Sequence, residues 1–171
     1  MATKQGSLNG AGDFSLEEVK LVTSTGMVID LSESVMGLTL YEDISSLTIT
    51  GTIAIVDSVN MVSHGPLIGQ EYLHLKIKTP SLSNEDSIID FSENAFLVHS
   101  ISKRQPVKNN VQGLVLSFVS QELVKNQRLK VTQSLTASWS DIVEKMMIDY
   151  LETKKKITIE SSSGIKKFVA P

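Results

Sequence analysis

The chain has 171 residues, of which 41% are hydrophobic and 20% charged, so it can form one folded domain or one domain and part of another. Its formal net charge of −3 differs from the basic surplus of proteins that hold nucleic acid tightly, and the absence of cysteine excludes disulfides and thiolate metal sites. No apolar run approaches the roughly 20 residues that span a bilayer, so no membrane association is expected.

Residues 1–13 are rich in Gly, Ser and Asn and lack the apolar segment of a signal peptide. This composition predicts a flexible N-terminal arm. Two interpretations stay open: an arm without a role, or an arm that becomes ordered on a neighbouring subunit.

From Leu16 to about Gln121 the apolar residues recur with a period of two, which is typical of half-buried strands. One alternating run surrounds Gly51 and a second spans residues 72–78. The predicted inward side chains are Leu47, Ile49, Ile53, Ile55, Leu73, Leu75 and Ile77. The predicted outward side chains, and our candidates for a subunit interface or a lumen face, are Thr48, Thr50, Thr52, Tyr72, His74, Lys76 and Lys78.

Other runs complete the pattern of a β domain over residues 14–125. Further strands are expected at Val19–Ser24, Met27–Leu31, Val35–Glu42, Ala95–Ile101 and Leu114–Val119. Thr25-Gly26 marks a hairpin, one helical turn is expected at Ser58–Ser63, Pro80–Asn94 reads as a polar loop, and Pro106–Asn110 as a turn. About seven strands with this spacing predict a mainly β fold, an antiparallel barrel or sandwich.

The period changes near the C-terminus, where one amphipathic helix is expected and makes the chain α+β overall. Its apolar stripe consists of Trp139, Ile142, Val143, Met146, Met147, Tyr150 and Leu151. Ser138 is the expected N-cap, with Asp141 at the third helical position. The stripe fits the inner face of its own domain or, as the alternative, a docking face for a partner.

Residues 126–171 are interpreted as a helix-containing segment that begins a second, incomplete domain. Ile157–Glu160 is expected to form one further strand. The apolar pair Phe168-Val169 is expected to begin a β segment that has no partner after it.

No set of residues carries a catalytic signature, and we expect neither an enzyme, nor a cofactor, nor a metal site. His64, His74 and His99 lack the spacing of a zinc site, and the acidic loop at Pro80–Asn94 lacks the glycine of an EF-hand. The modest basic cluster near residues 103–130 is not accompanied by aromatic side chains interleaved along the strands, so sequence-specific nucleic-acid binding is not expected.

The stretch Leu38–Pro80 contains an acidic pair after a strand (Glu42-Asp43), a Thr- and Ile-rich strand with a central Gly51, and the turn Pro66–Glu71. These residues resemble the first tube-like domain of the baseplate hub proteins of contractile-tailed bacteriophages. Residues 114–129, the helix that follows and the terminal residues 166–171 also resemble that family. Members of the family continue into a second tube-like domain, where this sequence ends.

The resemblance implies a tail-tube type fold and a structural role in the virion, assembled in the host cytoplasm. Hub proteins form trimers whose paired tube-like domains make a pseudo-sixfold ring. The implied partners are further copies of the chain, the tail tube protein, the central spike protein, and DNA that passes without sequence-specific binding. The alternative is a stand-alone β-barrel module that binds a peptide or an oligosaccharide.

Overall fold

The computed structural model describes residues 14–46, 48–58, 61, 67–79, 88–108 and 111–169. The chain divides into two compact units, the first ending at Ser120 and the second beginning at Gln121. The predicted boundary lay between residues 125 and 126, five residues later. Several predicted features lie outside the described residues: the flexible N-terminal segment at residues 1–13, Leu47, His64 and most of the expected helical turn at Ser58–Ser63.

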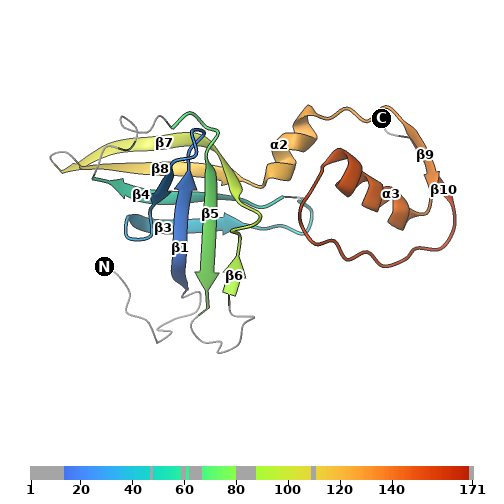
Figure 1. Cartoon of the computed structure of the whole chain (residues 1–171), viewed down its shortest axis with the longest axis horizontal. Helices are drawn as coiled ribbons and strands as arrows, with labels where there is room; N and C mark the ends of the chain where they lie inside the picture. Colours follow the sequence, from blue (N-terminus) through green and yellow to red (C-terminus); the bar gives the residue numbers. More distant parts are fainter. Residues whose placement is uncertain are drawn as a thin grey trace. The chain divides into compact units, whose positions relative to one another are not determined.

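The first unit is an antiparallel sheet in the order β2-β1-β5-β7-β8-β4-β3, with β6 also paired to β5 (Figure 1). The strands are β1 (Ser15–Val22), β2 (Val28–Asp30), β3 (Val35–Tyr41), β4 (Thr50–Asp57), β5 (Tyr72–Lys78), β6 (Ile88–Asp90), β7 (Phe96–Lys108) and β8 (Val111–Val119). The mainly β, antiparallel prediction is therefore confirmed. The predicted hairpin at Thr25-Gly26 joins β1 to β2, and Gly26 adopts a positive φ of 83° there.

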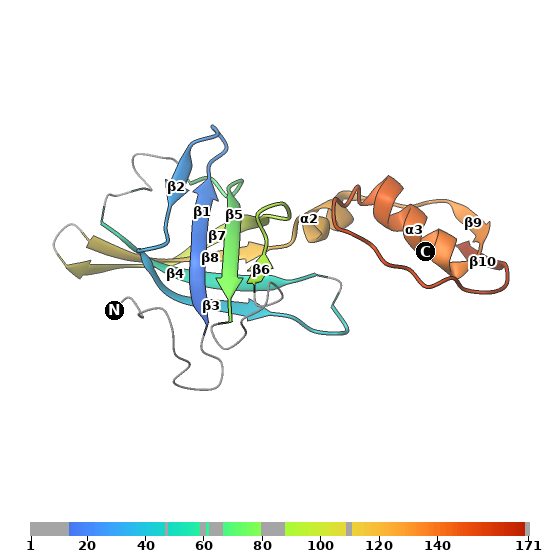
Figure 2. The same ribbon diagram turned by 60° about the horizontal axis from the view of Figure 1, so that its bottom comes forward.

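The sheet bends at the junction of β5 and β7, where only two residue pairs connect the strands: Tyr72 with Leu97 and Leu73 with Phe96. As a result β1 and β5 run across the direction of β3, β4, β7 and β8 (Figure 2). We call the part built on β1, β2, β5 and β6 the first arm, and the part built on β3, β4, β7 and β8 the second arm. Strands β2 and β3 end the order without pairing with each other, so the barrel is not closed.

The core lies on the inner side of this bend. Its buried side chains include those predicted to point inward on β4 and β5: Ile53, Ile55, Leu73, Leu75 and Ile77. Phe118 packs against Phe96 with ring centroids 4.9 Å apart. Gly51 faces Phe118, and a Cβ atom at this position would lie 2.5 Å from both the Phe118 ring and the Thr39 carbonyl oxygen. Glycine is therefore required at position 51 by close packing.

Two turn predictions in the first unit were wrong. Pro106 lies inside β7, opposite Gln112, where register shifts interrupt the β7–β8 ladder and the missing N–H of proline is tolerated. The expected polar loop at Pro80–Asn94 contains β6, whose Asp90 and Ile88 lie opposite Lys76 and Lys78. Strand β4 begins at Thr50, so Thr48 precedes it.

The second unit contains two helices where one was expected. Its elements are α2 (Gln121–Arg128), β9 (Ser134–Ala137), α3 (Trp139–Lys145), the π-helical turn η2 (Met146–Tyr150) and β10 (Lys166–Val169). Helix α2 follows β8 after one residue, and none of its residues is buried. The β segment expected at Phe168-Val169 is present as β10, and its partner is the preceding strand β9.

Helix α3 begins where the sequence predicts. Ser138 is its N-cap, and the Ser138 hydroxyl accepts a hydrogen bond from the Asp141 N–H at 3.2 Å. The predicted stripe is only partly buried, since Ile142 is 3% exposed while Trp139 and Val143 are 45% and 46% exposed. The expected strand at Ile157–Glu160 is absent, because this segment pairs with no other strand in the part of the chain that the structure describes.

Candidate assembly surfaces

The structure divides the predicted outward residues between the two arms of the sheet. Thr50 and Thr52 lie on β4 in the second arm, and Tyr72, His74, Lys76 and Lys78 lie on β5 in the first. Strands β7 and β8 separate β4 from β5 in the sheet order. The predicted outward residues therefore do not form one surface. Those on β4 and those on β5 have different neighbours in the sheet.

The outer side of the second arm carries no charge over three rows of residues that cross four strands. Residues directly opposite one another in a sheet share a face, so the register defines the rows. They are Tyr41, Thr50, Val119 and Leu97; Thr39, Thr52, Ser117 and Ser100; and Gly37, Ala54, Val115 and Ser102. We call these twelve residues the neutral face. Val119 is buried, and the other members are half-buried or exposed.

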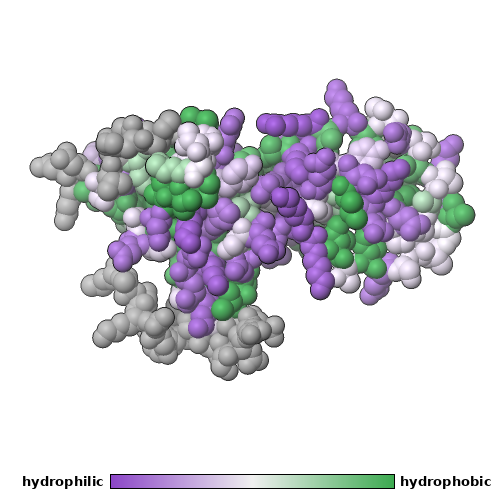
Figure 3. Space-filling model, in the orientation of Figure 1, coloured by the Kyte–Doolittle hydropathy of each residue, from purple (hydrophilic) through white to green (hydrophobic). Residues whose placement is uncertain are grey.

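The outer side of the first arm carries charges of both signs. Two rows cross it: Asp30, Lys20 and His74, then Glu18, Lys76 and Asp90. We call these residues, together with Lys78, the charged face. Tyr72 lies opposite Leu97, at the border with the neutral face. Figure 3 shows hydrophilic side chains gathered over β1 and β5. Lys20 lies 2.8 Å from Glu18, and Lys76 lies 3.8 Å from Asp90.

Local hydrogen bonds favour the ionised form of two carboxylates of the charged face, Asp30 and Asp90. The backbone N–H and side chain of Ser32 lower the pKa of Asp30, and the side chain and backbone N–H of Ser92 lower the pKa of Asp90. The hydrogen bond with Glu18 raises the pKa of Lys20. The face therefore keeps alternating charges near neutral pH.

Strand β3 is an edge of the sheet, since it pairs with β4 and with no other strand among the described residues. Its sequence, VMGLTLY, contains neither charge nor proline. Met36 is 68% exposed and Tyr41 is 58% exposed. An uncharged edge strand of this length is open to pairing with another chain, although the register shift between Val35 and Gly37 interrupts its regularity.

A buried carboxylate stabilises the described part of the turn at Pro66–Glu71, residues 67–71. Glu71 is fully buried and accepts hydrogen bonds from the N–H groups of Ile68 and Gly69, at 2.6 Å and 2.9 Å. Gly69 has a positive φ of 84°, which glycine adopts without strain. These contacts assign Glu71 a role in the fold.

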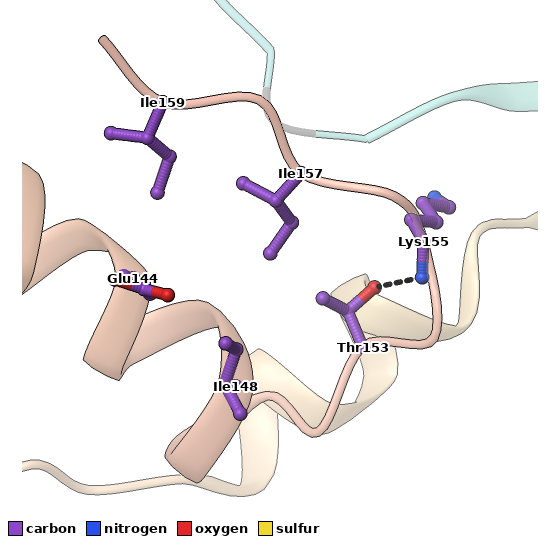
Figure 4. Close-up of a pocket in the computed structure, with 6 residues that line it drawn as sticks. All are labelled: Glu144, Ile148, Thr153, Lys155, Ile157 and Ile159. Carbon is purple, nitrogen blue, oxygen red and sulfur yellow. Dashed lines mark hydrogen bonds between the residues drawn. The ribbon is translucent and has the colours of Figure 1, made fainter.

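The second unit contains an open groove of about 500 Å³, which the sequence did not predict. Figure 4 shows Ile157 and Ile159 pointing toward Glu144 and Ile148 of the helix. Thr153 and Lys155 complete the lining. The groove is lined by three isoleucines and by three polar or charged side chains, and its mouth is wide.

Glu122 of α2 fastens the segment that follows η2. It accepts hydrogen bonds from the Thr153 hydroxyl at 2.8 Å and from the Lys155 ammonium at 2.9 Å. Burial disfavours the charged form of Glu122. The hydrogen bonds from Lys155, from its own backbone N–H and from Thr153 outweigh that effect and hold its pKa below the ordinary value.

Neither a metal site nor a membrane-spanning helix is found in the described residues. No three His, Asp or Glu side chains there converge on a point that could hold a metal ion. The Nδ1 atom of His74 lies 2.9 Å from the Ser92 carbonyl oxygen, and His99 is exposed. None of the described helices is long and apolar enough to cross a bilayer.

Comparisons with known proteins do not assign the chain to a family. No protein-family model matches it, and no curated protein matches its sequence.

Proposed function

We propose that the chain is a structural subunit of a phage tail baseplate hub, which forms a ring between the central spike and the tail tube and surrounds the DNA channel. The observation that carries the proposal is the neutral face, which ends at the uncharged edge strand β3. Interface cores are depleted in charge, and open edges pair with a neighbouring chain. The chain thus offers a surface suited to subunit contact beside an edge suited to strand pairing.

The charged face supports the lumen part of the proposal. Lys20, Lys76 and Lys78 are balanced by Glu18, Asp30 and Asp90 on the same side of the sheet. A surface of alternating sign attracts phosphates weakly, because Lys20 and Lys76 each have a carboxylate nearby. DNA would move along such a surface without being held.

The test is the mass of the full chain by light scattering over a range of concentrations. We expect a trimer or a larger ring. Thr50→Glu should disrupt the assembly and leave the fold intact, because it places charge on the neutral face. Ile53→Glu should unfold the first unit, because Ile53 is fully buried.

Lys78→Glu is the control on the charged face, and it should leave the mass unchanged. A chain that is monomeric at all concentrations would instead favour the stand-alone binding module. Equal loss of folding in Thr50→Glu and Ile53→Glu would contradict the assignment of the two sides of β4.

A further inference from the structure

Residues 156–161 of the second unit have the pattern of a strand but no strand partner. Ile157 and Ile159 are half-buried, and they alternate with exposed Lys156, Thr158 and Glu160. The segment runs extended past the helix (Figure 4). Within the residues that the structure describes, no backbone group of residues 156–161 makes a hydrogen bond.

An extended segment with free backbone groups can receive another strand. Residues 156–161 contain no proline and no glycine, and their centre, Ile157–Ile159, is rich in β-branched residues. These features favour strand pairing. Strand addition would satisfy the backbone N–H and C=O groups on that side and would supply the ladder that is missing from the predicted strand.

We propose that the partner strand is the same segment of a second copy of this chain, paired antiparallel about a two-fold axis at Thr158. In this register Lys156 lies opposite Glu160 of the second copy, and Ile157 lies opposite its Ile159. Each direct pair is thus favourable: opposite charges meet twice and isoleucines meet twice. The same contacts occur in both directions, as a two-fold interface requires.

Charge complementarity selects a second copy as the occupant. Lys156 and Glu160 form no ion pair with any other described residue. Their spacing of two residues on either side of Thr158 makes the segment complementary to itself when it is reversed. Pairing with β10 of a second copy would instead bring its exposed lysines, Lys166 and Lys167, toward a lysine-rich segment.

Apolar side chains in the groove would stabilise the pairing. Ile157 and Ile159 line the groove opposite Ile148 of η2, and Ile148 is 50% exposed. In an antiparallel pair, directly opposite residues share a face, so the isoleucines of the second copy would extend the same apolar layer. Ile142 is the one fully buried apolar side chain among the described residues of this unit, so the pairing would supply core that the unit lacks.

The pairing uses only the second unit and does not rest on the hub proposal. It adds a two-fold relation between chains, whereas the proposed ring uses the neutral face of the first unit. Thr50→Glu should therefore leave this pairing intact.

The first experiment measures the dissociation constant of the full chain by sedimentation, in the Thr50→Glu background. Lys156→Glu and Glu160→Lys should each weaken dimerisation by about tenfold or more, because each places like charges opposite one another twice. The double variant, Lys156→Glu with Glu160→Lys, should return the constant to within about threefold of the starting value. No merely structural role of either residue predicts that rescue.

The second experiment fixes the register by oxidation, using the absence of cysteine from the chain. Thr158→Cys should form a disulfide-linked dimer, because residue 158 lies opposite its own copy. Ser161→Cys is the matched control: it lies opposite residue 155 of the second copy, roughly 20 Å from its equivalent, beyond disulfide reach. A chain that stays monomeric, a dimer unaffected by both single variants, or equal cross-linking at positions 158 and 161 overturns the proposal.

Discussion

Different interactions stabilise the two units of the chain. The first unit contains all but one of the fully buried hydrophobic side chains of the described residues, from Val19 to Val119, and the second contains Ile142. The second unit relies instead on polar contacts, such as those of Glu122 with Thr153 and Lys155. Burial of apolar surface stabilises a fold far more than partly exposed ion pairs do. The first unit is thus expected to be the more stable of the two, and the second to be more sensitive to solution conditions.

The largest expected effect is separate unfolding of the two units in urea. Trp139 is the single tryptophan of the chain and lies in the second unit, 6.1 Å from the ring of Phe168. Its fluorescence should change at least about 1 M urea below the loss of β-sheet circular dichroism, because the second unit buries less surface. The fluorescence midpoint should rise with protein concentration if the second unit pairs with a second copy. If the fluorescence and circular-dichroism transitions coincided at every protein concentration, the two units would not differ in stability as we expect.

A smaller effect is expected from Glu71→Gln in the first unit. The substitution replaces a fully buried carboxylate that accepts hydrogen bonds from two backbone N–H groups, so we expect a loss of about 2 kcal/mol in the free energy of unfolding. Circular dichroism in urea measures it. The exposed Glu93→Gln is the control and should change little, while the Trp139 transition should not move in either variant.

The smallest effect concerns pH and the second unit. The pKa of Glu122 is lowered in the folded chain, so its stabilising contribution is present above the unfolded pKa of about 4.3 and is lost as the pH falls through the folded value. We expect the Trp139 transition to weaken below about pH 4. Glu122→Gln should reduce this pH dependence while leaving that of the first unit unchanged, and an undiminished dependence would assign it to another carboxylate.

Much of the first unit could be predicted from alternation alone. Ile53, Ile55, Leu73, Leu75 and Ile77 are buried as the period of two requires, because successive side chains of a strand point to opposite faces. The N-cap at Ser138 was also predictable, since its hydroxyl satisfies a local helix donor. Such features depend on residues that are near one another in the chain.

The candidate site was only partly predictable. Thr50 and His74 were both recognised as outward, but alternation could not show that one belongs to a neutral face and the other to a charged face. That difference is set by the neighbours that the strand order provides, such as Thr39 and Ser117 beside Thr52, or Lys20 beside His74.

The amino-acid sequence by itself determined which side chains enter the core, because that choice follows from local periodicity and the transfer of apolar groups from water. Only the tertiary structure decided which strands became neighbours, where the sheet stopped short of closing, and which segment was left without a ladder. Ile157–Glu160 shows the distinction: its residues have the alternation of a strand, yet a strand exists only where a second backbone lies beside it to exchange hydrogen bonds.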